Sequence, residues 1–253
     1  MQNARQSLKA FARAVLPRPV FERIAAVRSR RWQVAFLERN GLLDQVKKHL
    51  VEHGTAIQAG PFAGMVYPRE SALVRWCVPK LLGSYELELH PFLNTLSKRK
   101  YDCVIDIGSA EGYYACGLAR MFRVPVYAYD PEPYEKKFSA MMAECNGVSD
   151  LVKMADLFTE KEMKSFANQR ALVICDCEGF EETLFRPETL EFARNWDLLI
   201  ELHGTADKTL PALAWPHATH IVAAERRTGL RDEHRASYPQ HFLLCDAQPD
   251  RFI

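Results

Sequence analysis

The sequence has no long uninterrupted hydrophobic run. A membrane-spanning helix needs about 20 consecutive apolar residues, and no stretch of this chain approaches that length. The first 19 residues, MQNARQSLKAFARAVLPRP, carry Arg and Lys among their apolar positions, whereas a secretory signal peptide has a continuous apolar core. We therefore expect a cytoplasmic protein.

The cysteines follow neither a disulfide pattern nor a zinc-site pattern. Seven cysteines are scattered along the chain, several of them inside apolar runs, which is typical of buried thiols in a reducing compartment. Cys175 and Cys177 form a C-x-C pair, but no second pair stands at zinc-site spacing. The sequence thus gives no indication of a disulfide framework or a structural zinc site.

A strong overall charge is also missing. The net charge of +1 lacks the basic excess of general nucleic-acid-binding proteins, so we expect no nucleic-acid partner. Residues 1–52, however, carry 11 Lys and Arg against 4 Asp and Glu. Their basic face would either contact an anionic membrane surface or glycan, remain solvated, or pack on a second subunit of a homo-oligomer. That face comprises Arg13, Arg23, Arg28, Arg30 and Arg31.

Hydrophobic periodicity divides the chain near residue 100. Residues 4–16, 19–39 and a segment from Leu42 have helical periodicity, as do residues 73–96. From residue 101, short apolar runs alternate with amphipathic stretches, which predicts a doubly wound, mostly parallel α/β sheet of seven strands. We expect an N-terminal helical extension and lid over 1–100, and a Rossmann-like cofactor domain over 101–253.

The segment VIDIGSAEGYYA has the pattern of a cofactor loop between a buried strand and a helix. Glycines at such a turn let the backbone approach a ligand, and the helix N-terminus presents free N–H groups. A dinucleotide site would need Gly where Ala110 and Tyr113 stand. The observed spacing, Asp-x-Gly-x-x-x-Gly, instead suits a cationic ligand with one nucleoside and no pyrophosphate.

Acidic residues end the next two predicted strands. Asp130 is placed to accept hydrogen bonds from both ribose hydroxyls, and Asp156 lies where an adenine amino group is expected. The order of these features favours S-adenosylmethionine (SAM), with another nucleotide as the alternative. The predicted cofactor-binding residues are Asp106, Gly108, Ser109, Gly112, Asp130 and Asp156.

Four segments together resemble the FkbM-type branch of class I SAM-dependent methyltransferases. They are VIDIGSAEGYYA, VYAYDPEP, ALVICDCEGFEETLF and WDLLIELH, and the resemblance covers about residues 101–203. The family has an Asp-x-Glu-Gly-x-Glu pattern after its fourth strand and Ile-Glu-x-His at its fifth. The resemblance implies the class I methyltransferase fold and O-methylation of sugars or natural-product hydroxyls. Residues that match these patterns are Asp176, Glu178, Gly179, Glu181, Glu201 and His203.

The catalytic residues are expected at the carboxyl ends of the fourth and fifth strands, where parallel sheets gather their reacting groups. We predict His203 as the general base, because an unperturbed imidazole titrates near neutral pH. Asp176 or Glu178 is the alternative base, or the partner that orients His203. A further alternative is a Mg²⁺ ion bound by Asp176, Glu178 and Glu201, since carboxylate oxygens suit that ion. For Glu181 we expect only a favourable interaction with a helix dipole.

Tyr85, Glu86 and His90 are predicted to line the substrate side of the site, together with Glu201. Alternatively, Glu86 and His90 simply pair with each other as i, i+4 neighbours on a helix. Tyr113 and Tyr114 are expected to pack against the cofactor or cover it.

These features predict a SAM-dependent methyltransferase that modifies a hydroxyl of a saccharide or a small natural product. N-methylation is the alternative reaction. An inactive SAM-binding module of a biosynthetic complex is the non-enzymatic alternative, although such a module needs no base at its strand ends.

Overall fold

The computed structural model describes residues 34–35, 38–39, 43–69, 77–203, 219–223 and 241–245. The chain forms two compact units, one of residues 1–54 with 69–77 and one of residues 55–68 with 78–253. The basic face from Arg13 to Arg31 lies outside the described residues, as do most of the helices expected over 4–39. In the first unit, α3 (Leu43–His53) confirms the helix predicted from Leu42. The boundary expected after residue 100 stays a prediction.

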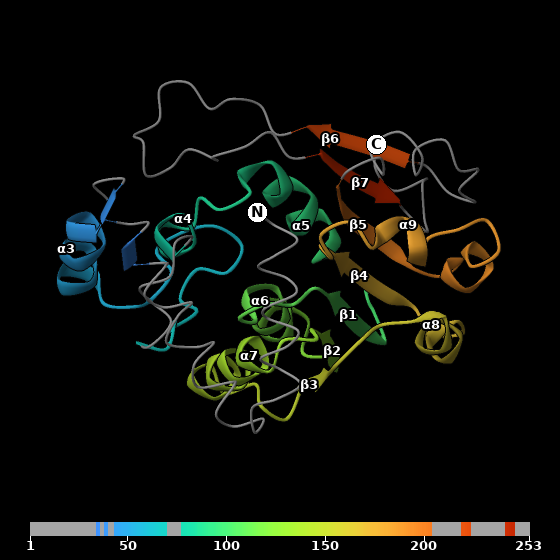
Figure 1. Cartoon of the computed structure of the whole chain (residues 1–253), viewed down its shortest axis with the longest axis horizontal. Coiled ribbons are helices and arrows are strands. Elements are labelled where there is room, and N and C mark those ends of the chain that lie inside the picture. Colours follow the sequence, from blue (N-terminus) through green and yellow to red (C-terminus); the bar gives the residue numbers. More distant parts are fainter. Residues whose placement is uncertain are drawn as a thin grey trace, which may run out of the picture. The chain divides into compact units, whose positions relative to one another are not determined.

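The second unit contains the predicted α/β sheet (Figure 1). Five parallel strands are neighbours in the order β3-β2-β1-β4-β5, followed by the antiparallel β7 and then β6. The parallel strands are β1 (Cys103–Ile107), β2 (Val126–Tyr129), β3 (Val152–Ala155), β4 (Ala171–Cys175) and β5 (Asp197–Leu202); the last two are β6 (Thr219–Ala223) and β7 (His241–Cys245). The parallel α/β architecture confirms the fold class expected from the alternating sequence pattern.

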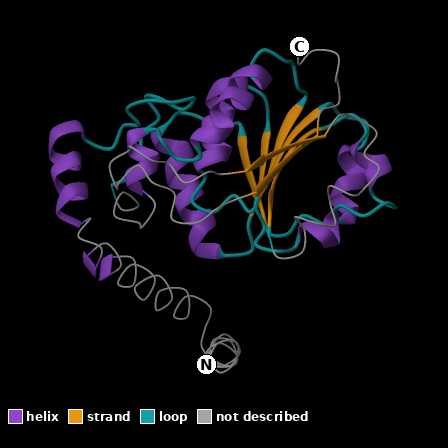
Figure 2. Ribbon diagram, turned by 90° about the horizontal axis from the view of Figure 1, so that it is seen from above, coloured by secondary structure: helices purple, strands orange, loops and turns teal. Residues whose placement is uncertain are grey.

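Helices cover both faces of the parallel strands (Figure 2), which explains why β1, β4 and β5 are mostly apolar and fully buried. On one face α6 packs on β1 and β2, and α7 packs on β3. Of the later helices, α8 follows β3, and α9 and η2 follow β4. Their bounds are α6 (Tyr113–Phe122), α7 (Pro133–Cys145), α8 (Glu160–Phe166), α9 (Glu181–Leu184) and η2 (Leu190–Ala193).

A core rich in aromatic residues lies between the sheet and the helices α8, α9 and η2. Phe158, Phe166 and Trp196 pack there against alternate residues of β1, β4 and β5. Trp196 is 1% exposed, and its indole Nε1 donates to the carbonyl oxygen of Phe166. This layer fixes the relative positions of the strand ends that carry the candidate site.

The helix predicted over residues 73–96 is interrupted, so within the described residues 77–96 that prediction is wrong. The segment forms α4 (Cys77–Leu82), the 3-10 helix η1 (Leu87–Leu89) and α5 (His90–Leu96). The residue at the break has to be glycine, because a Cβ on Gly83 would lie 2.0 Å from the carbonyl oxygen of Ala59. Glycine permits this close contact, and its positive φ of 72° ends α4.

Among the residues that the structure describes, no helix combines the length and the apolar character needed to cross a membrane.

The carboxyl ends of β1 and β4 approach each other very closely. The Asp176 N–H donates to the Ile107 carbonyl oxygen over 2.9 Å, which extends the pairing of β1 with β4 by one residue. A Cβ on the next residue, Gly108, would lie only 1.7 Å from the Asp176 carbonyl oxygen. The cofactor loop and the end of β4 can therefore meet only because residue 108 is glycine.

Replacing Gly108 with alanine tests this contact. Gly108→Ala should lower the free energy of unfolding by more than about 3 kcal/mol, because it adds a backbone clash to the strain of a positive φ. The matched control is Gly147→Ala. Gly147 also has a positive φ, but its added Cβ would meet no atom within 4 Å, so only about 1–2 kcal/mol should be lost. Urea unfolding gives both values, and equal losses would contradict the proposed clash.

Candidate functional site

The loop between β1 and α6 is held by the end of β2. The N–H groups of Gly108 and Ser109 both donate to the Tyr129 carbonyl oxygen, over 2.9 and 3.1 Å. The Ala110 N–H donates to Asp130 Oδ2 over 3.0 Å. Asp130 Oδ1 accepts from the Glu132 N–H over 2.8 Å, so the carboxylate is fixed from two sides. The two predicted cofactor elements are therefore joined by three hydrogen bonds from the loop backbone.

Three residues of this loop have left-handed backbone conformations. Gly108 and Gly112 have φ values of 82° and 89°, as their glycine identity allows, but Ala110 also has a φ of 42°. A non-glycine residue in this region stores strain, and such residues gather at functional sites. Gly112 also abuts α7, since a Cβ there would lie 2.6 Å from Ser139 Oγ.

Buried and half-buried carboxyl groups lie around the loop. Asp106 is 2% exposed, and burial, followed by the nearby Asp176 carboxylate, raises its pKa to about 8. Its Oδ2 has no hydrogen-bond partner within the described part of the chain. Burial is also the main cause that raises the pKa of Asp130, and that of Glu135 on α7 to about 7. A cationic ligand at this loop would stabilise the ionised form of these groups.

The third predicted acid lies in a different environment. Asp156 follows β3 with a side chain that is 77% exposed, and it forms an ion pair with Lys136 of α7. It shares an edge of the sheet with Asp130, because β2 and β3 are paired in register. Its contact with an adenine ring stays a prediction.

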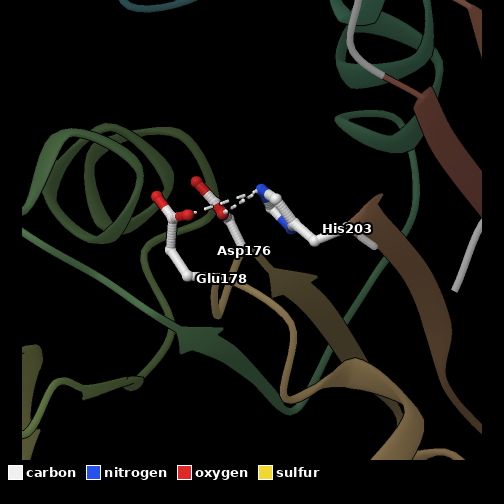
Figure 3. A group of neighbouring side chains, drawn as sticks. All are labelled: Asp176, Glu178 and His203. Atoms are coloured by element: carbon white, nitrogen blue, oxygen red, sulfur yellow. Dashed lines mark ion pairs between the residues drawn. The ribbon is translucent and has the colours of Figure 1, made fainter. Parts of the chain in front are cut away.

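Four carboxylates surround His203, which directly follows β5. Its Nε2 lies 3.8 Å from Asp176 Oδ1, 3.9 Å from Glu178 Oε2 and 3.6 Å from Glu201 Oε1. Figure 3 shows the imidazole directed at the side chains of Asp176 and Glu178, which follow β4. The structure thus brings together the residues predicted at the ends of the fourth and fifth strands.

The fourth carboxylate, Glu181, has a larger part in the site than the helix-dipole role expected for it. Its side chain is fully buried at the start of α9, and Oε1 lies 3.0 Å from His203 Nδ1. The same oxygen accepts from the backbone N–H groups of Cys177 and Gly179, each over 3.2 Å. Because an ionised carboxylate can only accept, His203 Nδ1 carries the proton and Nε2 faces Asp176 and Glu178.

This environment changes the acid–base character of His203. The hydrogen bond to Glu181 raises the pKa of His203 to about 9; burial opposes the shift, and Asp176 and Glu201 reinforce it. The pKa thus lies above the near-neutral value of a free imidazole, and the role of His203 as the general base stays a prediction. The surrounding carboxylates therefore favour the protonated imidazole more than water does.

Glu178 reaches the cluster through a strained turn. It has a φ of 56°, and the following Gly179 has a φ of 100°. Left-handed φ is uncommon for glutamate. The turn nevertheless directs its exposed side chain at His203 (Figure 3), so the local strain serves the geometry of the cluster.

The predicted substrate-side residues Tyr85, Glu86 and His90 lie in the segment between α4 and α5. Glu86 has a φ of 47° and is 5% exposed, and it accepts a hydrogen bond from the Tyr114 hydroxyl. His90 Nε2 lies 2.9 Å from the Tyr85 carbonyl oxygen. The alternative prediction of a helical Glu86–His90 pair is wrong, because the backbone turns at Glu86 before α5 begins.

Burial raises the pKa of Glu86 to about 7, even though hydrogen bonds from Tyr114 and Tyr85 act in the opposite direction. The Asp176 carboxylate adds to the rise, and Lys80 reduces it. Glu86 is therefore electrostatically linked to the strand-end cluster.

One pair that connects this segment to the cofactor loop was missed by sequence reasoning. Lys80 of α4 forms an ion pair with Glu111 of the loop. The Lys80 Nζ also lies 4.8 Å from the ring centroid of Tyr85 and 5.1 Å from that of Tyr113. The Tyr67 hydroxyl donates to Glu111 over 3.3 Å. Only the fold reveals this pairing, because the partners are 31 and 44 positions apart.

No protein-family model matches the sequence, and no curated protein is significantly similar to it. Solved structures with a similar backbone include precorrin 8w decarboxylase from Methanobacterium thermoautotrophicum, with a TM-score of 0.45 and 17% identity over 64% of this chain and 90% of that one. An rRNA methylase from Streptococcus thermophilus has a TM-score of 0.43 and 15% identity over 64% and 97% of the chains. The O-methyltransferase TomG from Streptomyces achromogenes, solved with SAM, has a TM-score of 0.42 and 15% identity over 62% and 78%.

The raised pKa of Glu86 predicts a specific pH dependence of stability. The native state holds this proton more tightly than the unfolded state, so the contribution of Glu86 falls as pH rises from its ordinary pKa of 4.5 to about 7. Glu86→Gln lacks this loss and still accepts from Tyr114. Relative to wild type, its free energy of unfolding should rise by on the order of 1–3 kcal/mol between pH 5 and pH 8. Urea unfolding across this range measures the difference, and a constant difference would contradict the assignment.

Proposed function

We propose that the protein is a SAM-dependent methyltransferase that methylates a hydroxyl group of a saccharide or a small natural product. The observation that carries the proposal is the joining of the Asp-x-Gly-x-x-x-Gly loop to Asp130 by the hydrogen bond from Ala110. This hydrogen bond holds the glycine loop after β1 next to Asp130 after β2. The loop would let a ligand approach the backbone, and the Asp130 carboxylate would accept hydrogen bonds from its ribose hydroxyls.

The charges around the loop support a cationic cofactor. SAM carries a sulfonium and an ammonium group, and Asp106, Asp130 and Glu135 are carboxyl groups whose pKa values are raised chiefly by burial. A bound cation would offset the cost of ionising them. A dinucleotide would place an anionic pyrophosphate against the same carboxylates, which is unfavourable.

The reaction would proceed by in-line displacement at the methyl carbon. The acceptor oxygen forms a bond to this carbon with a lone pair, the carbon–sulfur bond breaks, and its electron pair stays on sulfur to give S-adenosylhomocysteine. The acceptor proton passes to the cluster formed by Asp176, Glu178 and His203. In this proposal the protein aligns the oxygen, carbon and sulfur atoms and removes the proton.

Two features favour a hydroxyl acceptor near β4 and β5. The cluster holds carboxylates next to a histidine, a combination that can take a proton from an oxygen nucleophile. The sequence also resembles the FkbM-type branch through Asp176, Glu178 and His203, and that resemblance implies O-methylation. The Asp176 carboxylate contributes to the raised pKa of both Tyr85 and Glu86. These two residues would border the acceptor.

Binding of S-adenosylhomocysteine tests the cofactor assignment. Isothermal titration of the wild-type chain should show one site, and Asp130→Ala should weaken it by about 2–3 kcal/mol through loss of charged hydrogen bonds. Asp150→Ala, at an exposed carboxylate just before β3, is the matched control and should bind like wild type.

Thermal unfolding must first show that Asp130→Ala remains folded, because Asp130 also holds the cofactor loop. Wild-type affinity in a folded Asp130→Ala variant would refute the ribose role of Asp130. No binding by the wild-type chain would refute the proposed function as a whole.

A further inference from the structure

The cluster after β4 and β5 has the composition of a metal site as well as that of a base. We infer that Asp176, Glu178 and His203 bind a divalent metal ion beside the cofactor site. One carboxylate oxygen from each acid and one imidazole nitrogen lie within 4.8 Å of one another. This ligand set differs from the three carboxylates predicted for Mg²⁺ from the sequence, because His203 takes the place of Glu201.

The imidazole nitrogen and the carboxylate oxygens of the cluster lie too far apart to be hydrogen-bonded to each other. His203 Nε2 lies 3.8 Å from Asp176 Oδ1 and 3.9 Å from Glu178 Oε2, beyond the 2.7–3.2 Å typical of hydrogen bonds. Neighbouring ligands around an octahedral ion with bonds of about 2.1 Å are about 3 Å apart. Small side-chain rotations would therefore close the three groups around an ion.

His203 is already oriented as a metal ligand. The fully buried Glu181 accepts from Nδ1 and is itself fixed by the backbone N–H groups of Cys177 and Gly179. This leaves Nε2 directed at the two acids (Figure 3). A carboxylate on the far nitrogen of a histidine is the usual outer partner of a metal-bound imidazole, because it sets the tautomer and the ring orientation.

An unsatisfied oxygen gives independent support. Asp176 Oδ1 is buried and has no hydrogen-bond partner among the described residues, although the side chain as a whole is 41% exposed and this oxygen lies 3.8 Å from His203 Nε2. A buried carboxylate oxygen without a donor is costly, and a bound cation would satisfy it. Glu201 Oε1, 3.6 Å from the same nitrogen, borders the site and adds negative charge.

The mixed ligand set narrows the choice of ion. Carboxylate oxygens suit Mg²⁺, Ca²⁺ and Mn²⁺, whereas an imidazole nitrogen favours transition metals, so Mn²⁺ accommodates both ligand types. If the proposed methyl transfer is correct, the ion would bind the acceptor hydroxyl and lower its pKa, and the proton would pass to Glu201 instead of to the three ligands. An acceptor with a second oxygen next to the target hydroxyl, such as a vicinal diol, would occupy two open positions on the ion.

Electron paramagnetic resonance of Mn²⁺ tests the site without measuring activity. Titration of the full chain should remove the free-ion signal with one Mn²⁺ bound per chain. Asp176→Asn and Glu178→Gln should each weaken binding at least about tenfold, and Glu181→Gln should weaken it about 10–100-fold through His203. The matched control is Glu188→Gln, an exposed carboxylate on the connection between β4 and β5, which should bind like wild type.

The outcomes separate the metal site from the proposed function. No Mn²⁺ binding by the folded wild-type chain overturns the metal site, as does equal binding by wild type, Asp176→Asn and Glu178→Gln. The exposed Glu178 keeps the test valid if Asp176→Asn fails to fold. Titration with S-adenosylhomocysteine on the same samples reports on the cofactor: binding of the nucleoside without Mn²⁺ refutes only the metal, and binding of Mn²⁺ without the nucleoside refutes only the methyltransferase.

Discussion

The contact between the ends of β1 and β4 is the constraint on which the rest of the site depends. Hydrogen bonding from Asp176 to Ile107 continues the strand pairing, and the absent side chain of Gly108 lets the cofactor loop lie against the Asp176 backbone. The loop is tied to Asp130 on one side, and Asp176 stands beside His203 on the other. A single backbone contact therefore sets the distance between the proposed cofactor and the proposed reacting groups.

The electrostatics of the site agree with the two cationic ligands proposed for it. Burial raises the pKa values of Asp106 and Glu86 to about 8 and about 7, and Asp176 contributes to both shifts. Ionising these groups would cost less beside the cationic ligands proposed here. A sulfonium at the loop and a divalent ion at the strand ends would each relieve part of this charge, which makes the two proposals electrostatically compatible and separately testable.

Much of the fold could be predicted from the sequence, because it depends on local pattern. Apolar runs such as CVIDI and ALVIC, alternating with amphipathic segments, specify buried parallel strands. The strand-end positions of Asp176 and His203 follow from the same pattern. Other features depend on contacts between distant residues: the break at Gly83 against Ala59, the Lys80–Glu111 pair, and the burial of Glu181. The pKa of His203 belongs to this group, since Asp176 and Glu181 after β4 and Glu201 at the end of β5 together raise it.

The most direct measurement of the central claim is a crystal structure of the chain with S-adenosylhomocysteine. The account predicts that the ribose hydroxyls contact Asp130, that the nucleoside lies over the loop from Gly108 to Gly112, and that its sulfur faces Asp176 and His203. A nucleoside bound away from this loop, or one whose sulfur faces away from β4 and β5, would contradict the account.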